Sequence, residues 1–459
     1  MKQKVALLSS LLVITACKDL NSPYWNDFVS SRDANTGLRD SSSPIADEHI
    51  LNDYSYAGYF SNDIPLPSAT PKASNASYRV INVQDYGALP DDDISDKQAI
   101  KNAIEAIKQY RQQYHHSSTD VLYFPAGTYI INNADDDALI DPNNLDDIKN
   151  KQPIFVDLDR IILKGDGIGV TTLKMDTHLQ PENPAKKWTT PHMLQVGARS
   201  SSTTVSANIL LQSDVVGGSA NTVTVDNVQG FQVGDSIELR SLITRSRAIE
   251  KAVSPYLIEY KASSPNVPVW ANLTKGLNKR EKHTIQSISG NTLTFATPIA
   301  HSLSAQDKWT VSKITSYANI GIENLTISGN WQGDFVHHKD ALHDSGYSLL
   351  SLRRAHNSWI RDVELRNFNQ GGVLWNTYNV TARNITLSGT PGHLAFTIMY
   401  GNNNLIDGLT DHSKAWHAPG VSKYSISNVY RNSQYGADSS IDLHGEQSMH
   451  NLFYNMTGG

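Results

Sequence analysis

The sequence predicts an all-β chain folded as a parallel β-helix, a solenoid in which each turn of the chain forms one rung of stacked strands. One observation is a repeat. Similar strand segments recur about every 20–24 residues after a longer first interval, and they begin at Ile322, Ile360, Ala382, Ile406, Ile426 and His450. The other is composition. Charged residues make up only 18% of the 459 residues, while Asn, Ser, Thr and Gly are frequent, as in turn-rich β structure.

Composition and pattern divide the chain into five segments. They are a leader (1–17), a polar tether (18–75), an N-terminal cap with the first rungs (76–199), an inserted β-rich region (200–315) and the C-terminal rungs (316–459). Within the tether, "NDYSYAGYF" is too rich in Tyr for a free linker, so we expect it to pack on the main body. The last rung stops at "YNMTGG". Because an open β-helix end needs covering, we expect either a truncated sequence or a cap from elsewhere.

The leader reads "MKQKVALLSSLLVITAC". Two lysines precede an apolar stretch that is too short to span a membrane. Since "ITAC" resembles a lipobox, we expect Cys17 to be lipidated and the protein to be exported and anchored to the outer membrane through that lipid. A secretory signal with an incidental cysteine is the alternative. Cys17 is the only cysteine, which excludes an intramolecular disulfide.

The region after the tether predicts a capping helix. Asp96 is a suitable N-cap, and one apolar face follows it, formed by Ala99, Ile100, Ala103, Ile104 and Ile107. Together, "VINVQDYGALPDDDISDKQAIKNAI", "LYFPAGTYII" and "LKGDGIGVTTLKM" resemble the N-terminal signature of the pectate-lyase superfamily, in its rhamnogalacturonase/epimerase-like branch. The resemblance covers Tyr78–Met175 and implies a right-handed parallel β-helix capped by a helix at Lys97–Tyr110. It says little about function, since lyases, hydrolases, epimerases and phage tailspikes share this fold.

Aligned rungs can be read as columns, because equivalent positions stack about 4.8 Å apart. An apolar column predicts the core and contains Leu352, Leu374 and Ile398. A polar column predicts a solvent-facing groove and contains Arg354, Asn376, Tyr400, Gly420 and His444. A second polar column contains His356, Tyr378, Asn402, Ser422 and Glu446.

Histidines and basic residues also gather in the C-terminal rungs. Nine of the sixteen histidines lie at or after His337. We select His444, Tyr400, Arg354 and His417 as candidate catalytic residues. As candidate substrate-binding residues we select Asn376, Trp416, Lys414, His412, Arg431 and Glu446. Each has an ordinary structural alternative, such as a solvated turn or, for Trp416, a buried ring in a loop.

These residue types fit eliminative cleavage of a uronic-acid polymer. The proton next to a carboxylate becomes removable when Arg, Lys, Asn or a cation neutralises that carboxylate. Arg354 and Asn376 could neutralise it, His444 or His417 could act as the base, and Tyr400 could be the acid, or base and acid together. We therefore expect a polysaccharide lyase acting on an acidic, uronate-containing and possibly sulfated polymer.

Other functions stay open. Hydrolysis needs two facing carboxylates, and the Asp-Asp pair with Gly-His typical of β-helix pectin hydrolases is not present. A non-catalytic glycan-binding surface β-helix is the alternative from another class. No metal motif is found, and Ca²⁺ remains an optional cofactor. The net charge of −6 argues against a nucleic-acid partner. The oligomeric state is left open.

Overall fold

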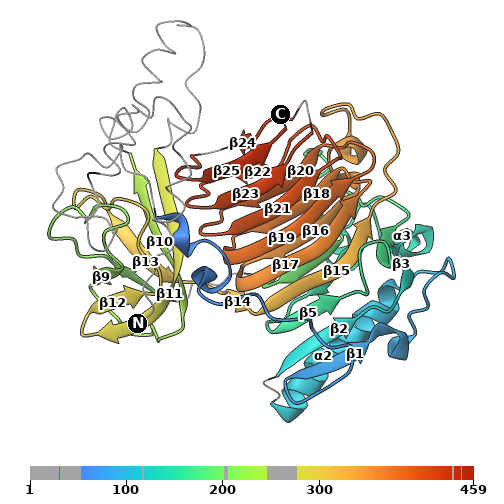
Figure 1. Cartoon of the computed structure of the whole chain (residues 1–459), viewed down its shortest axis with the longest axis horizontal. Coiled ribbons are helices and arrows are strands. Elements are labelled where there is room, and N and C mark those ends of the chain that lie inside the picture. Colours follow the sequence, from blue (N-terminus) through green and yellow to red (C-terminus); the bar gives the residue numbers. More distant parts are fainter. Residues whose placement is uncertain are drawn as a thin grey trace, which may run out of the picture.

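The computed structural model describes residue 30 and residues 53–115, 118–200, 205–244, 276–436, 439–445 and 447–458. Cys17 lies outside the described residues. The described chain forms two large parallel sheets along one solenoid and an antiparallel sheet beside it (Figure 1). This confirms the predicted parallel β-helix with an inserted β-rich region.

The larger parallel sheet has twelve strands. Its main path runs through β1 (Tyr78–Asn82), β2 (Thr119–Tyr123), β5 (Ile161–Lys164), β15 (Ile320–Ser328), β17 (Ala355–Arg366), β19 (Tyr378–Ser388), β21 (Leu405–Asp411), β23 (Val429–Gln434) and β25 (Leu452–Thr457). Beside this path lie β3 (Gly127–Asn132), β6 (Thr171–Met175) and β14 (Tyr317–Ala318).

The smaller parallel sheet has seven strands. In spatial order they are β4 (Ile154–Val156), β7 (Leu194–Gly197), β16 (Ser348–Arg353), β18 (Gln370–Trp375), β20 (Leu394–Met399), β22 (Gly420–Ser422) and β24 (Asp442–His444). In the C-terminal half of the chain, strands of the two parallel sheets alternate along the sequence, so one strand from each makes up a rung.

The repeat positions proposed from the sequence are partly correct. Ile322 pairs with Ile360, Ile360 with Ala382, and Ala382 with Ile406. The next two members of this column are Tyr430 and Phe453, not the predicted Ile426 and His450. Ile426 instead lies opposite Asn402 and Met449, at an earlier position of the rung. The short apolar pattern around Ile426 resembled the repeat closely enough to hide this shift.

A column of left-handed residues bends the long strands of the twelve-stranded sheet. Five of its members are Asn or Asp and one is Gly, residue types that adopt positive φ at low cost; they are Asn324, Asp362, Asn384, Gly408, Asn432 and Asn455. Side chains of neighbouring rungs also bond to each other here. Asn384 Nδ2 donates to Asp362 Oδ1 at 2.9 Å, and Asn455 Nδ2 donates to Asn432 Oδ1 at 2.8 Å.

The helix α2 (Lys97–Tyr114) packs on the first rungs, as predicted for the cap. Its buried apolar residues are Ile100, Ala103, Ile104 and Ile107. Asp96 holds the N-cap position, but its carboxylate accepts hydrogen bonds from the backbone N–H groups of Leu89 and Ile130, at 2.8 and 3.0 Å, rather than from the helix. The other helical segments are η3 (Tyr54–Tyr56), η4 (Tyr59–Asn62), η5 (Val83–Tyr86), α3 (Ala134–Ala138), α4 (Leu145–Lys151) and η6 (Leu342–Gly346). Within the described part of the chain, none of the helices combines the length and apolarity needed to cross a membrane.

The Tyr-rich N-terminal segment lies against the twelve-stranded sheet. The Tyr59 N–H donates to Thr381 Oγ1 at 2.8 Å, and the Gly58 N–H donates to the Asn403 carbonyl at 2.8 Å. The Tyr59 ring meets the Trp359 ring edge-on, with 5.5 Å between centroids. Gly58 has φ 103°, and a Cβ there would come within 2.8 Å of Thr381 Oγ1, so the contact requires glycine.

A buried ionic network lies between the N-terminal segment and the twelve-stranded sheet. Glu323 is completely buried, and its carboxylate contacts Lys164 Nζ at 3.2 Å and Arg361 Nη2 at 2.6 Å. Trp359 Nε1 donates to the same carboxylate at 3.1 Å. Arg361 also donates to the Pro67 carbonyl at 2.5 Å, so the network ties the N-terminal segment to the solenoid.

The inserted region forms a six-stranded antiparallel sheet with its own apolar core. Its strands, in spatial order, are β8 (Ser206–Asn208), β13 (Trp309–Lys313), β10 (Ser236–Ile243), β11 (Leu277–Ser289), β12 (Thr292–Phe295) and β9 (Thr222–Thr224). The sheet packs on the solenoid through polar contacts. The Tyr378 hydroxyl lies 2.7 Å from Ser236 Oγ and 3.0 Å from Thr284 Oγ1, and the Asn402 amide pairs with the Lys282 backbone at 3.0 and 2.9 Å.

Candidate functional site

The outer face of the seven-stranded sheet carries a row of large and polar side chains. One column of paired residues contains Arg353, Trp375, Met399, Ser422 and His444. The residues just before the first four of them form the buried core column, which consists of the predicted Leu352, Leu374 and Ile398 and of Val421, whereas Leu443 in the last strand is 65% exposed. Because side chains alternate along a strand, the first column points away from the core.

The predicted polar column is found in the turn that follows these strands. Arg354, Asn376 and Tyr400 all adopt left-handed φ values of 44°, 60° and 56°. Their backbones bond from rung to rung: Arg354 N–H donates to the Trp375 carbonyl and Asn376 N–H to the Met399 carbonyl, both at 2.8 Å. These three side chains therefore project from consecutive rungs, as predicted.

The prediction was wrong for the last two members of that column, Gly420 and His444. Gly420 pairs with Thr397 and Ser422 pairs with Met399, so Lys423 and not Gly420 follows Tyr400 in the column. His444 pairs with Ser422 and belongs to the strand column instead. The cause is the same shift that displaces the repeat positions in the last two rungs. Arg353 and His444 lie four strand spacings apart, roughly 19 Å, so Arg354 and His444 cannot act on the same sugar carboxylate.

The second polar column is buried and helps to join the solenoid to the inserted sheet. His356, Tyr378 and Asn402 stack in register as expected, but all three are buried. The last two bond to the inserted sheet, while the His356 ring stacks on the Tyr378 ring at 4.9 Å. Burial lowers the pKa of His356 to about 4, so its ring stays neutral. Ser422 does not belong to this column, which continues through Ile426 and Met449. Glu446 lies outside the described residues.

A basic and aromatic surface surrounds the polar column, and we call it the turn cluster. It consists of Arg280, Lys282, Arg353, Arg354, Trp375, Asn376, Tyr400, Lys423 and Tyr424. The Trp375 and Tyr400 rings meet at 5.2 Å, and Lys423 Nζ lies 5.8 and 5.9 Å from their centroids. Arg280 of the inserted sheet lies 5.9 Å from the Tyr400 ring, and Lys282 Nζ donates to the Tyr400 carbonyl at 2.5 Å.

The turn cluster has unused hydrogen-bonding groups. Among the described residues, no carboxylate comes within ion-pair distance of Arg353 or Arg354, and the Nε of each is buried without a hydrogen-bond partner. Asn376 Oδ1 is likewise buried without a partner. Burial lowers the pKa of both arginines, since their charge is only partly solvated. Such a surface is suited to an anionic ligand.

A second group of side chains gathers beside β20, β22 and β24, and we call it the histidine cluster. Its members are His337, His338, His393, His417 and His444. The His417 ring lies 4.6 Å from the His444 ring and 5.0 Å from the His393 ring. Asp442 joins two of them, with its carboxylate oxygens 3.4 Å from His417 Nδ1 and 3.9 Å from His444 Nδ1.

A cavity of about 350 Å³ opens beside the histidine cluster. It is lined by Trp416 and Lys414, two of the candidate substrate-binding residues, together with Phe335 and the segment Thr390–Gly392. Trp416 is 61% exposed and stacks on His337 at 4.9 Å. An exposed ring at the mouth of a cavity can stack on a sugar.

Two further candidates lie elsewhere. Arg431 lies on the twelve-stranded sheet, where its guanidinium contacts Asp407 at 2.9 Å beside Arg383. His412 is exposed directly after β21, at the start of the segment that leads to Trp416. The structure therefore brings neither into the turn cluster.

The outer face of the seven-stranded sheet has few carboxylates and many histidine nitrogens, which limits the reactions and metal ions that it suits. The strands of the seven-stranded sheet contain a single carboxylate, Asp442. Hydrolysis by two facing carboxylates would thus need groups from the loops. Ca²⁺ usually takes six to eight oxygen ligands, whereas this face offers mainly nitrogen. Two groups bring their ligand atoms within 4.8 Å of one another: His337, His338 and His393, and His417, Asp442 and His444.

Sequence reasoning missed part of the turn cluster. Lys423 was noted only as one of several basic residues, because the alignment placed Gly420 in its column. Arg280 and Lys282 come from the inserted region, more than a hundred residues before Tyr400. Their basic run, "NKREK", was visible in the sequence, but nothing in the spacing indicates that it faces these rungs.

Comparison with known proteins supports the fold. Residues 80–239 match the family model described as rhamnogalacturonase A/epimerase, pectate lyase-like. This match supports a pectate-lyase-like β-helix for that part of the chain. The matched residues cover the cap, the first rungs and the start of the inserted sheet. They stop before the strands that carry both clusters, and no curated protein matches the sequence.

Several solved structures are similar to this chain at low sequence identity. The tailspike protein gp49 of Pseudomonas phage LKA1 is 12% identical, with a TM-score of 0.47, and the match covers 82% of this chain and 59% of that one. The exopolygalacturonase of Thermotoga maritima is 13% identical, with a TM-score of 0.33 and coverage of 82% and 66%. The mannuronan C-5 epimerase A-module of Azotobacter vinelandii is 12% identical, with a TM-score of 0.29 and coverage of 82% and 74%. The chain thus spans 59% of the tailspike's length.

Proposed function

We propose that this protein cleaves an acidic, uronate-containing polysaccharide by β-elimination at the turn cluster. The observation that carries the proposal is the pair Arg353 and Arg354, which have no carboxylate partner among the described residues and lie beside Trp375 and Tyr400. Positive charge next to aromatic rings supplies both an anion site and a stacking surface for a sugar.

The column supplies the groups that the reaction needs. Arg354 and Asn376 would bind the uronate carboxylate and stabilise the negative charge that develops when the adjacent carbon loses its proton. Tyr400, in the next rung, would remove that proton and protonate the sugar oxygen that leaves as the neighbouring C–O bond breaks and a C=C bond forms.

The test is incubation of the purified protein with a panel of uronate polymers. β-Elimination gives new chain ends together with the ultraviolet absorbance of the conjugated unsaturated uronate. New reducing ends without that absorbance would indicate a hydrolase, and altered uronate stereochemistry without cleavage would indicate an epimerase. Binding without any reaction would favour a glycan-binding surface protein. Each of these three outcomes contradicts the lyase proposal.

Replacing Arg354 by Ala should lower kcat/KM on the active polymer by about 10²-fold, because one donor to the developing charge is lost. Initial rates over a range of substrate concentrations measure this. Arg431→Ala is the matched control, since that arginine lies on the other sheet and pairs with Asp407; it should retain wild-type kinetics. Equal losses in both variants would mean that general charge, and not the turn cluster, binds the polymer.

Binding of the anionic polymer should weaken as the pH rises through about 8. Burial lowers the pKa of Lys282 to about 8, with Glu238 opposing this shift. Lys282 is therefore charged below that pH and neutral above it. Its Nζ contacts the Tyr400 carbonyl, so the charge lies within the turn cluster. Dissociation constants between pH 6.5 and 9.5 should rise in the wild type. In Lys282→Met the rise should be absent, and a persisting rise would assign it to another group.

We also propose, from the leader sequence alone, that the protein is exported and attached to the outer membrane through a lipid on Cys17. Metabolic labelling with a fatty-acid analogue tests this, since labelling should be lost in Cys17→Ser.

A further inference from the structure

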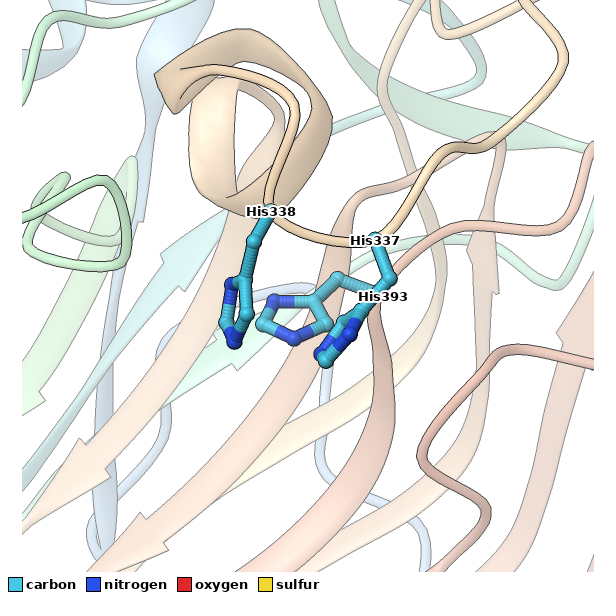
Figure 2. Close-up of side chains that lie close together, drawn as sticks. All are labelled: His337, His338 and His393. Atoms are coloured by element: carbon cyan, nitrogen blue, oxygen red, sulfur yellow. The ribbon is translucent and has the colours of Figure 1, made fainter.

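His337, His338 and His393 converge at one point beside the cavity. Figure 2 shows the first two on one loop and the third on the neighbouring segment, with the three rings gathered together. Their ligand nitrogens lie within 4.8 Å of one another. The ring centroids are 3.8 Å apart for His337 and His338, 5.3 Å for His337 and His393, and 5.5 Å for His338 and His393.

Asp344 fixes the orientation of two of these rings. This completely buried residue lies in η6, and its Oδ2 is 2.6 Å from His338 Nδ1. Its backbone carbonyl is 2.8 Å from His393 Nδ1. A carbonyl can only accept, so His393 carries its proton on Nδ1 and presents a lone pair on Nε2. A carboxylate or carbonyl behind the ring is the usual outer-shell arrangement of a histidine that binds a metal.

The free nitrogen of His393 is the second observation that points to a ligand. His393 is only 7% exposed, and among the described residues its Nε2 is buried without a hydrogen-bond partner. A buried nitrogen without a partner is costly unless something binds it.

We propose that His337, His338 and His393 bind a single divalent transition metal ion of the Zn²⁺ class. Three nitrogens on one tetrahedral zinc lie about 3.3 Å apart, so the rings must approach by less than about 1.5 Å. The loop that carries His337 and His338 can make this small shift, because it lies at the surface, where His338 is half-exposed. Imidazole ligands favour zinc, copper and nickel over Ca²⁺.

Two neighbouring histidines, His343 and His417, are not part of the proposed ligand set. His343 is close in sequence, but its Nδ1 accepts the Val336 N–H at 3.0 Å. His417 lies 5.0 Å from His393, ring to ring, and 5.7 Å from His337. Three nitrogen ligands leave a fourth position on a tetrahedral ion, which is the arrangement of reactive rather than purely structural zinc sites. This position would lie near the cavity lined by Trp416, where a water or a ligand oxygen could occupy it.

The test measures metal binding by the full-length protein, stripped with a chelator and titrated with Zn²⁺ against a fluorescent indicator. We expect about one tight site per chain, weakened at least about 10-fold in His338→Ala and in His393→Ala. Asp344→Asn should weaken it by about 10–100-fold. His412→Ala is the matched control, an exposed histidine outside the cluster, and should bind like the wild type.

Co²⁺ absorption spectroscopy distinguishes a defined metal site from nonspecific binding of metal to the surface. Co²⁺ in the wild-type protein should give the intense visible absorption of a four-coordinate ion, and His337→Ala, on the exposed loop, should lose it while circular dichroism stays unchanged. Wild-type Zn²⁺ affinity in both His338→Ala and His393→Ala would overturn the proposal. So would Co²⁺ binding with only the weak spectrum of the hexahydrated ion. The readout does not involve polysaccharide, so this site and the proposed lyase activity can fail separately.

Discussion

Tyr400→Phe should lower kcat on the active polymer by about 10²–10⁴-fold, the usual contribution of a positioned proton-transfer group. Only one hydroxyl is removed. The ring would keep its contacts with Trp375 at 5.2 Å and with Tyr424 at 5.9 Å, so the turn should retain its shape and KM should change little. Initial-rate kinetics by unsaturated-uronate absorbance measure the effect.

Tyr454→Phe is the control for this variant. Tyr454 is 64% exposed on β25 of the other sheet, so removal of its hydroxyl should leave kcat unchanged. If Tyr400→Phe keeps wild-type kcat, the proton-transfer role moves away from the turn cluster. His417→Ala and His444→Ala would then be the next variants, because those rings lie on the same face beside Asp442. A loss in them alone would place the reaction at the histidine cluster.

Glu323→Gln should destabilise the folded protein by about 3–5 kcal/mol, the usual cost of removing one partner from a buried ion pair. The glutamine leaves Lys164 and Arg361 without their negative partner, and Lys164 is only 3% exposed. Chemical denaturation at neutral pH measures the difference in unfolding free energy. The matched control is Asp176→Asn, which breaks a half-exposed pair with Lys174 and should cost about 0–1 kcal/mol.

The same network has a defined pH dependence. Burial raises the pKa of Glu323, but side-chain hydrogen bonds and the charges of Arg361 and Lys164 together outweigh it, and the net pKa lies below the ordinary value. A carboxylate with a lowered folded-state pKa stabilises the protein above its unfolded pKa, about 4.3. The wild type should therefore exceed Glu323→Gln in stability at neutral pH, and the gap should shrink as the pH falls below about 4. A gap that stays constant down to pH 3 would contradict this.

The sequence predicted the fold well because a solenoid repeats its pattern. Ile322, Ile360, Ala382 and Ile406 occupy the same inward position in successive rungs, so their spacing reports the stacking directly. The prediction failed at Ile426 and His450, although the true steps from Ile406 to Tyr430 and on to Phe453 are 24 and 23 residues, close to the earlier spacing. A one-dimensional pattern cannot show which of two nearby apolar residues enters the core.

The candidate site was harder to predict for a different reason. Arg354, Asn376 and Tyr400 could be aligned because they belong to the repeat. Arg280 and Lys282 reach Tyr400 from another sheet, and the packing of that sheet depends on contacts such as Tyr378 with Ser236. The convergence of His337 and His338 with His393 likewise depends on how a loop folds over the strands. Long-range packing of this kind leaves no spacing signal.

The N-terminal segment has a consequence for the order of folding. Most contacts in a solenoid join neighbouring rungs and can form one after another as the chain is made. The bond from Tyr59 to Thr381 instead joins residues 322 positions apart. Its acceptor exists only once β19 has been synthesised and stacked. The segment that leaves the ribosome among the first is therefore expected to dock among the last, and it must stay unattached until the middle of the solenoid is in place.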